Sequence, residues 1–421
     1  MKKAIILLIS LLLLTAGCSV TEGEPSVPIE PSAAAEDVGV PSPDPSLIPP
    51  PSPLPSLLPS PEPPPEPEPT VITIQFAGDI LLHDSTIENA KIGDGMYDFK
   101  PFFEVIKPWI GGDLALCNME TPVDVHGGNK NVIGYPRFNA PFEILEGLEY
   151  AGFNHLIHAN NHVFDQKLAG LQATLANFAR AGFSHTGTYA DEESFNTPTM
   201  LDVQGIQIGV LAYTDAVNGL ENLIPDSVRP FAVRRFSSNS LNSLPKMAED
   251  IAALREAGAE FVIVSLHWGA EYVDKPTQTQ QEIARGLAEA GADAVMGGHA
   301  HCVQPIEWHE REDGSKSLIM YSLGNFLSDQ SRRNDPLHKT QYGMLVSLTV
   351  TKTPEGDVFL GDCTVLPTLC ARNEEDRYTL LPQPNPGDAA VAVSMFGETT
   401  ADWGNRAYEH IQKIVGEGFL S

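Results

Sequence analysis

Residues 246–301 of this 421-residue chain read KMAEDIAALREAGAEFVIVSLHWGAEYVDKPTQTQQEIARGLAEAGADAVMGGHAH, and this stretch decides the fold. Apolar residues recur at helical spacing over Lys246–Ala257 and Thr279–Ala290, and a glycine follows each segment, as is common at helix C-termini. Continuous apolar runs at Phe261–Ser265 and Ala294–Met296 predict buried strands. Helices that alternate with buried strands indicate an α/β fold.

The same alternation continues on both sides of this stretch. A further helix is predicted over Leu168–Ala181, and residues 304–366 are rich in strand patterns with few helices, which predicts a second, mixed or antiparallel sheet. Further strands are predicted at Val71–Ala77, Asp113–Cys117, Asn154–His158, Ile206–Ala212, Ser317–Tyr321 and Met344–Val350. We expect one domain over residues 71–421, with two sheets between layers of helices.

Polar residues gather at the ends of five predicted strands. The five groups are Gly78-Asp79, Asn118-Met-Glu120, Ala159-Asn-Asn161-His162 with Asp165, His267-Trp-Gly-Ala-Glu271, and Gly297-Gly-His299-Ala-His301. Each group alone is weak evidence, because a Gly-Asp pair is an ordinary turn and a single histidine usually serves the structure. Loops at the carboxyl ends of strands meet at one crevice in α/β sheets, so together the five groups predict one site.

The residue types in these groups are typical of a metal site. Carboxylates, amide oxygens and imidazoles bind hard to borderline ions such as Mn²⁺, Fe, Zn²⁺ or Mg²⁺. The cysteines have no zinc-finger spacing, so a structural thiolate site is not expected.

Together with Tyr321-Ser-Leu-Gly-Asn325-Phe326, these motifs resemble, in order, those of the CapA family of poly-γ-glutamate capsule proteins, over about residues 71–330. That family is related to calcineurin-like metallophosphatases, so the resemblance implies a metallophosphatase-like four-layer α/β/β/α sandwich. It also implies functional residues. The implied metal ligands are Asp79, a bridging Glu120, Asn161, His267 and His299 on one ion, and His301 on the other. His162 would act as general acid, with Asp165 as its partner in the catalytic motif.

The resemblance is incomplete at two positions. The phosphatase Asp-x-His motif is here Asp79-Ile-Leu81, so one histidine ligand is missing, and the bridging residue is a longer glutamate. We therefore expect one or two divalent ions.

The N-terminus is typical of an exported lipoprotein. Two lysines precede the apolar run Ala4–Leu14, and Thr15-Ala-Gly-Cys18 resembles a lipobox. We expect residues 1–18 to be a signal peptide that ends at a lipidated Cys18, whose two acyl chains suffice for stable anchoring. The alternative is an ordinary cleaved signal. The expected location is the extracytoplasmic face of the cell membrane.

Residues 19–70 hold eighteen of the 35 prolines and no lysine or arginine. Such a segment cannot build a core, so we predict a disordered, acidic, extended linker. A recognition tract for a proline-binding module is the alternative.

The net charge is −29, and the sequence shows no basic stripe of the kind that nucleic-acid binding requires. We therefore expect no nucleic-acid partner. An anionic envelope polymer or a phosphoester would need a local positive site such as a metal. Six arginines are candidate anion contacts: Arg137, Arg229, Arg234, Arg235, Arg332 and Arg333.

Three functions remain open from the sequence. The first is a metal-dependent, phosphoesterase-like hydrolase of the cell envelope. The second is a non-catalytic, polymer-binding accessory of capsule synthesis that contacts the membrane components of the synthase, and the third is a solute-binding lipoprotein. Cys363 and Cys370 are the more favoured disulfide pair, with free thiols as the alternative. Residues 374–421 carry no interpretable motif, although Trp403–Val415 fits a packing helix.

Overall fold

The computed structural model describes residues 67–330, 339–372, 377–383 and 398–420. The predicted signal peptide, Cys18 and nearly all of the predicted linker lie outside these ranges, as do Arg332 and Arg333. Within them, no helix is both long and apolar enough to cross a membrane.

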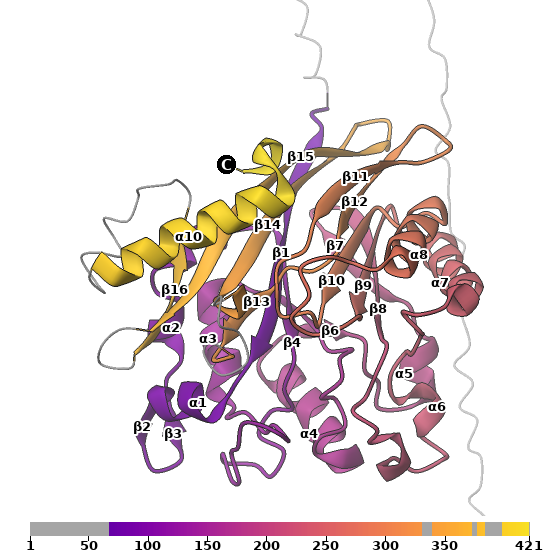
Figure 1. Ribbon diagram of the computed structural model, residues 1–421. Helices are drawn as coiled ribbons and strands as arrows, with labels where there is room; N and C mark the ends of the chain where they lie inside the picture. The colour runs from indigo at the N-terminus through magenta and orange to yellow at the C-terminus, as the bar shows by residue number, and fades with distance from the viewer. Residues whose placement is uncertain (1–66, 331–338, 373–376, 384–397, 421) are drawn as a thin grey trace, which may run out of the picture. The chain divides into compact units, whose positions relative to one another are not determined.

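The larger of two main sheets has eight strands in the order β16-β15-β14-β1-β4-β5-β6, with β13 beside β1 (Figure 1). Its strands are β1 (Thr70–Leu81), β4 (Leu114–Met119), β5 (His155–Ile157), β6 (Ser184–Thr186), β13 (Asn325–Ser328), β14 (Tyr342–Lys352), β15 (Val358–Arg372) and β16 (Tyr378–Pro382). The half from β1 to β6 is parallel, and β14, β15 and β16 add antiparallel neighbours.

The second sheet has six strands in the order β11-β12-β10-β9-β8-β7. Its strands are β7 (Thr199–Val203), β8 (Ile206–Thr214), β9 (Phe261–His267), β10 (Ala294–Gly298), β11 (Ile306–Glu310) and β12 (Lys316–Met320). The prediction that residues 304–366 form their own sheet is therefore wrong. β11 and β12 extend the sheet of β10, whereas β14 occupies the edge of β1 that β4 leaves open.

Helices cover the outer face of each sheet. α7 (Leu244–Glu256) and α8 (Gln278–Glu289) pack on the six-stranded sheet, where Ile251 and Ile283 join an apolar cluster with Val264 (Figure 1). Thr277 caps the N-terminus of α8, and its side chain accepts a hydrogen bond from the Gln280 backbone in a capping box. α2 (Lys100–Phe103), α3 (Glu143–Ala151) and α4 (Lys167–Arg180) lie with the eight-stranded sheet. The three helices predicted from periodicity are confirmed as α4, α7 and α8.

The two sheets pack face to face. Ile72, Ile74 and Phe76 alternate along β1 and belong to the same apolar cluster as Ile208 of β8 and Ile263 of β9. The layers therefore run helices, sheet, sheet, helices, which confirms the expected α/β sandwich.

The remaining elements are short, apart from the last helix. They are α1 (Asp84–Ala90), α5 (Glu192–Asn196), α6 (Arg229–Ala232) and the hairpin of β2 (Lys91–Gly93) and β3 (Met96–Tyr97). α10 (Glu398–Val415) contacts β15 and β11, and it buries Ala407 and Ile411. The packing helix predicted at Trp403–Val415 is confirmed, and it begins earlier than predicted.

Cys363 and Cys370 both lie in β15. A strand advances about 3.3 Å per residue, so their Cα atoms are roughly 23 Å apart, whereas a disulfide needs less than about 7 Å. The favoured disulfide pair is therefore wrong, and no disulfide joins the cysteines in the described ranges.

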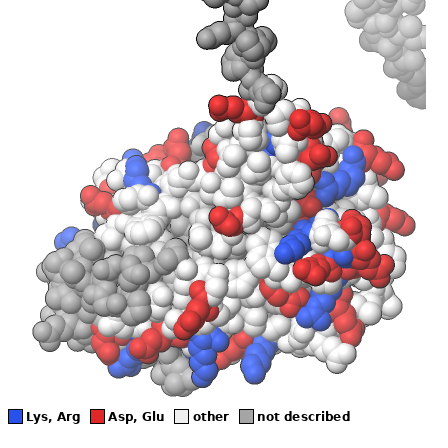
Figure 2. Space-filling model, turned by 90° about the horizontal axis from the view of Figure 1, so that it is seen from above, with Lys and Arg blue, Asp and Glu red and all other residues white. Residues whose placement is uncertain are grey.

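Figure 2 shows the face from which β1 starts, with acidic and basic residues interspersed. On the described part of this face, lysines and arginines form no continuous stripe of the kind that a phosphate backbone requires.

Candidate metal centre

The candidate metal centre lies where parallel strands of the two sheets end. The six predicted ligands are Asp79, Glu120, Asn161, His267, His299 and His301, and all except the partly buried His299 are buried. Ligand atoms of Asp79, Glu120 and His267 lie within 4.8 Å of one another, as do those of Glu120, His299 and His301. The structure therefore brings side chains from five separate strand ends into one cluster, and Glu120 belongs to both groups.

Asp79 lies near the end of β1, which pairs with both β4 and β13. Its carboxylate accepts hydrogen bonds from Asn118 Nδ2 at 2.7 Å and from the His299 backbone N–H at 3.2 Å, and it lies 3.2 Å from His301 Nδ1. Burial would raise the pKa of Asp79, but the hydrogen bond and the charge of His301 hold that pKa below its ordinary value. The structure therefore favours the ionised, ligating form of this carboxylate.

Two glycines allow the close packing around Asp79. A Cβ at Gly78 would lie 1.9 Å from the carbonyl oxygen of Gly324, and a Cβ at Gly298 would lie 2.8 Å from Asp79 Oδ1. Only glycine, which has no Cβ, lets the backbone of the Gly-Asp and Gly-Gly-His motifs come this close to its neighbours in the site.

His267 provides the clearest test of whether these residues fit a cation. Its Nε2 lies 2.9 Å from Asn161 Oδ1, 3.0 Å from His299 Nδ1 and 3.3 Å from Glu120 Oε1. A single ring nitrogen carries either one proton or one lone pair, so it cannot form hydrogen bonds with all three neighbours at once. Lone pairs that converge in this way fit a shared metal ion.

Glu120 supports the same conclusion. Its carboxylate is fully buried, and neither oxygen has a hydrogen-bond donor within the described residues. Burial, followed by the charge of Asp79, raises the pKa of Glu120 to about 8. A buried acceptor without a donor is costly, and a bound cation would relieve that cost.

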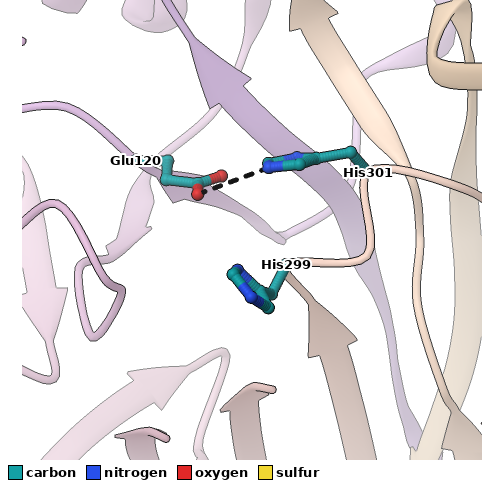
Figure 3. Close-up of side chains that lie close together, drawn as sticks. All are labelled: Glu120, His299 and His301. Atoms are coloured by element: carbon teal, nitrogen blue, oxygen red, sulfur yellow. Dashed lines mark ion pairs between the residues drawn. The ribbon is translucent and has the colours of Figure 1, made fainter. Parts of the chain in front are cut away.

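The histidines differ in their electrostatics. Burial lowers the pKa of both His267 and His299 to about 3, so both are neutral ligands at pH 7. Burial also disfavours the charged form of His301, but the Glu120 and Asp79 carboxylates outweigh it and raise its pKa to about 9. Figure 3 shows His301 and Glu120 pointing toward each other, with an ion-pair distance of 3.9 Å and His299 nearby. A divalent ion would displace the proton of His301, and the carboxylate, amide and imidazole donors together fit one or two such ions.

Two of these histidines have an unusual backbone conformation. His299 has φ 82° and His301 has φ 54°, in the left-handed region that non-glycine residues rarely adopt. Such strain costs about 1–3 kcal/mol per residue and is common at functional sites.

His162 and Asp165 form a pair beside the cluster. His162 Nδ1 lies 2.8 Å from Asp165 Oδ2, which also accepts a hydrogen bond from the Phe138 backbone at 2.9 Å. The Phe138 ring packs edge-on against His162, with centroids 4.6 Å apart. Asp165 therefore holds the imidazole in one orientation, with Nε2 left for another partner.

Two cavities open beside the cluster. The larger, of about 730 Å³, is lined by residues that include His83, Tyr272 and His301. The smaller, of about 290 Å³, is lined by residues that include Asn161. Tyr135, His162, and Glu271 line both cavities. The candidate centre thus faces an open cleft on two sides.

Comparison with known proteins now identifies the family. Residues 73–330 match the family described as bacterial capsule synthesis protein PGA_cap. This chain belongs to the PGA_cap family. The match covers more than half of the chain and includes every residue of the cluster described above.

Two curated relatives agree with this assignment. The PGA biosynthesis protein CapA of Bacillus subtilis is 28% identical over 264 residues, which cover 62% of this chain and 64% of that protein. The capsule biosynthesis protein CapA of Bacillus anthracis is 27% identical over 268 residues, which cover 62% and 60%. The matched region thus spans less than two thirds of either relative.

Among solved structures, the NAD nucleotidase NadN of Haemophilus influenzae is similar, with a TM-score of 0.42 and 13% identity. The similarity covers 82% of this PGA_cap chain and 60% of that one.

Several residues of this PGA_cap site had no role assigned from the sequence. Asn118, Asn325 and Glu271 lie in the quoted motifs, where Asn118 contacts Asp79 and Asn325 Oδ1 lies 3.0 Å from His301 Nδ1. His83 and Tyr135 lie outside those motifs. The signal for His83 is its place two residues beyond Leu81, where the resemblance expects a histidine.

Four of the candidate anion contacts lie in the described ranges, and of these four only Arg137 lines either cavity. The others form ion pairs: Arg229 with Asp226, Arg234 with Asp250, and Arg235 with Glu221.

Proposed function

We propose that this protein is a metal-dependent hydrolase that cleaves a phosphoester or related bond in the synthesis of a capsule or other envelope polymer. The observation that carries the proposal is the convergence of Asn161 Oδ1, His299 Nδ1 and Glu120 Oε1 on His267 Nε2, where Glu120 is buried and has no hydrogen-bond partner among the described residues. Asp79, Glu120, Asn161, His267, His299 and His301 would hold one or two divalent ions.

The protein's own residues supply positioning and proton transfer. Asp165 orients His162, so His162 Nε2 can protonate a leaving oxygen in the cleft. When bound, a divalent ion would polarise the scissile group and lower the pKa of water. Asn118 and Asn325 orient the ligands Asp79 and His301.

We propose that the protein works outside the cytoplasmic membrane, attached through a lipid on Cys18. The support is the signal-like N-terminus and the proline-rich segment between Cys18 and the domain. Labelling cells with an alkyne fatty acid should tag the wild-type chain and not a Cys18→Ser variant. Equal labelling of both chains would refute the anchor.

The hydrolase proposal is tested with the full-length chain in detergent. Wild type, a His267→Ala/His299→Ala double variant and the control His309→Ala, which lies in β11 and pairs with Glu289, are compared by elemental analysis after exposure to Mn²⁺ and Zn²⁺. Hydrolysis of bis(p-nitrophenyl) phosphate is measured in parallel. We expect metal and activity in the wild type and the control, and neither in the double variant. A wild-type chain that takes up neither ion would end the hydrolase proposal.

One observation favours a second function, a non-catalytic accessory of capsule synthesis. Leu81 is buried and apolar where the resemblance expects a metal-binding histidine, so one ion position lacks a ligand. An accessory that contacts polymer and the membrane components of the synthase would retain polymer after chelation. Polymer retention that needs metal would count against this second function.

A further inference from the structure

The two cavities of the cleft meet at the candidate metal centre. Tyr135, His162 and Glu271 line both, whereas the ligand Asn161 faces the smaller cavity and the ligand His301 faces the larger. We call them the smaller arm and the larger arm. A substrate held at the centre can therefore extend on both sides of its reacting bond, which suits a chain rather than a small terminal group.

The two arms differ in charge. The smaller arm contains Arg137, which is exposed and forms no ion pair or side-chain hydrogen bond with any described residue. It also contains two carboxylates, of which Asp165 pairs with His162 and Glu271 lies at the junction with the larger arm. The larger arm contains three carboxylates, Asp84, Asp329 and Glu271, and one arginine, Arg372, which lies 3.7 Å from Asp329. Arg137 thus gives the smaller arm an unpaired cation for an anionic group, whereas the larger arm has more carboxylates than cations and suits groups that donate hydrogen bonds.

Tyr135 stands at the junction of the arms. Its side chain is exposed (69% for the residue), and its ring touches Phe138 edge-on with centroids 6.4 Å apart, so a ring face stays open to the cleft. An exposed aromatic ring beside carboxylate acceptors fits a ligand with apolar C–H faces and hydroxyl donors. Sugar rings have both features.

We propose that the cleft binds a glycan chain that carries an anionic group. Tyr135 packs against a sugar ring, Glu271 accepts hydrogen bonds from its hydroxyls, and Arg137 holds the anionic group in the smaller arm. A chain of γ-linked glutamates carries a negative charge on every unit, so Asp84, Asp329 and Glu271 would repel it in the larger arm. This inference rests on the proposed function and names the substrate class of the same cleft.

The test measures binding, so it does not depend on turnover. The full-length chain, in buffer with EDTA and again with Mn²⁺, is applied to an array of bacterial polysaccharides that includes phosphorylated glycans, with poly-γ-glutamate on the same surface. The variants are Tyr135→Ala, Arg137→Ala and Glu271→Gln, and the matched control is Phe359→Ala, an exposed aromatic on β15 outside the cleft.

We expect at least one phosphorylated glycan to bind the wild type and the control. Tyr135→Ala should weaken this binding by about tenfold or more, the effect of losing one well-placed ring contact. Arg137→Ala should weaken the binding of phosphorylated glycans more than the binding of neutral ones. Glu271→Gln should improve the retention of poly-γ-glutamate. Binding to poly-γ-glutamate alone, binding to no glycan, or glycan binding that the three variants leave unchanged would each overturn the proposal.

The two proposals can fail separately. If phosphate diester hydrolysis persists but no glycan binds, only the substrate class is wrong. If glycans bind but the chain takes up no metal and hydrolyses nothing, the hydrolase proposal fails and the glycan site stands.

Discussion

Asn118 should control metal affinity although it lies outside the predicted ligand set. It is buried, it donates to Asp79 Oδ1 at 2.7 Å, and its Nδ2 lies 3.3 Å from His267 Nδ1. A hydrogen bond to a charged group contributes about 1.5–3 kcal/mol. Since 1.4 kcal/mol corresponds to a factor of ten, Asn118→Ala should weaken Mn²⁺ or Zn²⁺ binding by about ten- to a hundredfold.

The matched control for this prediction is Asn177→Ala. Asn177 is also buried, and its Nδ2 donates to the Val123 carbonyl at 2.8 Å, on α4 and outside the ligand cluster. Both variants should lose about 1–2 kcal/mol of unfolding free energy, measured by urea denaturation in EDTA. Only Asn118→Ala should lose metal affinity, measured by competition with a chelator. The reasoning would be refuted if Asn118→Ala bound metal as tightly as the wild type. It would also be refuted if Asn118→Ala and Asn177→Ala lost metal affinity to the same extent.

Three further changes have defined outcomes. Gly298→Ala places a methyl group 2.8 Å from Asp79 Oδ1, so metal content by elemental analysis should fall while circular dichroism stays native; full metal content would contradict this. Leu81→His offers the expected missing ligand at the wall of the larger cavity, so metal per chain should rise, and an unchanged ratio would argue against a second ion position. Burial lowers the pKa of His155 to about 3, below its ordinary 6.5, so the stability it contributes is present above pH 6.5 and is lost as the pH falls toward 3. At pH 5 the loss of unfolding free energy from this histidine is about 2 kcal/mol. In urea denaturation, His155→Gln should therefore lose less unfolding free energy than the wild type between pH 7 and 5. Parallel plots of unfolding free energy against pH for the two proteins would contradict the lowered pKa of His155.

The local patterns predicted the elements well, because periodicity reports burial directly. Lys246–Ala257 and Thr279–Ala290 are helices with one apolar face, and Phe261–Ser265 is the core of a buried strand. What the patterns could not give is the partner of each strand. β12 and β14 read alike, yet one pairs with β10 and the other with β1. The pairing partner of a strand depends on which sheet edge is still unpaired, and the sequence of a single segment does not contain that information.

The same limit applies to the site. The clustering of the six candidate ligands could be predicted because carboxylate and imidazole at strand ends are distinctive, whereas their role as ligands stays a prediction. Asn118 and Asn325 could not be assigned, because their function rests on contacts 39 and 24 residues away along the chain. Asp79 and His267 also lie within their strands rather than beyond them, since the ladders with neighbouring strands continue to these residues.

β1 runs from one end of the domain to the candidate metal centre at the other end. The strand starts at Thr70 and reaches Asp79 nine residues later, a distance of about 30 Å at 3.3 Å per residue. A tether joined ahead of Thr70 would therefore leave the domain at one end, while the candidate ligands lie at the other end. Tension on such a tether would load β1 at the start of its ladder with β14, far from the metal ligands. An attachment at the Thr70 end would therefore leave the cleft beside the candidate metal centre unobstructed.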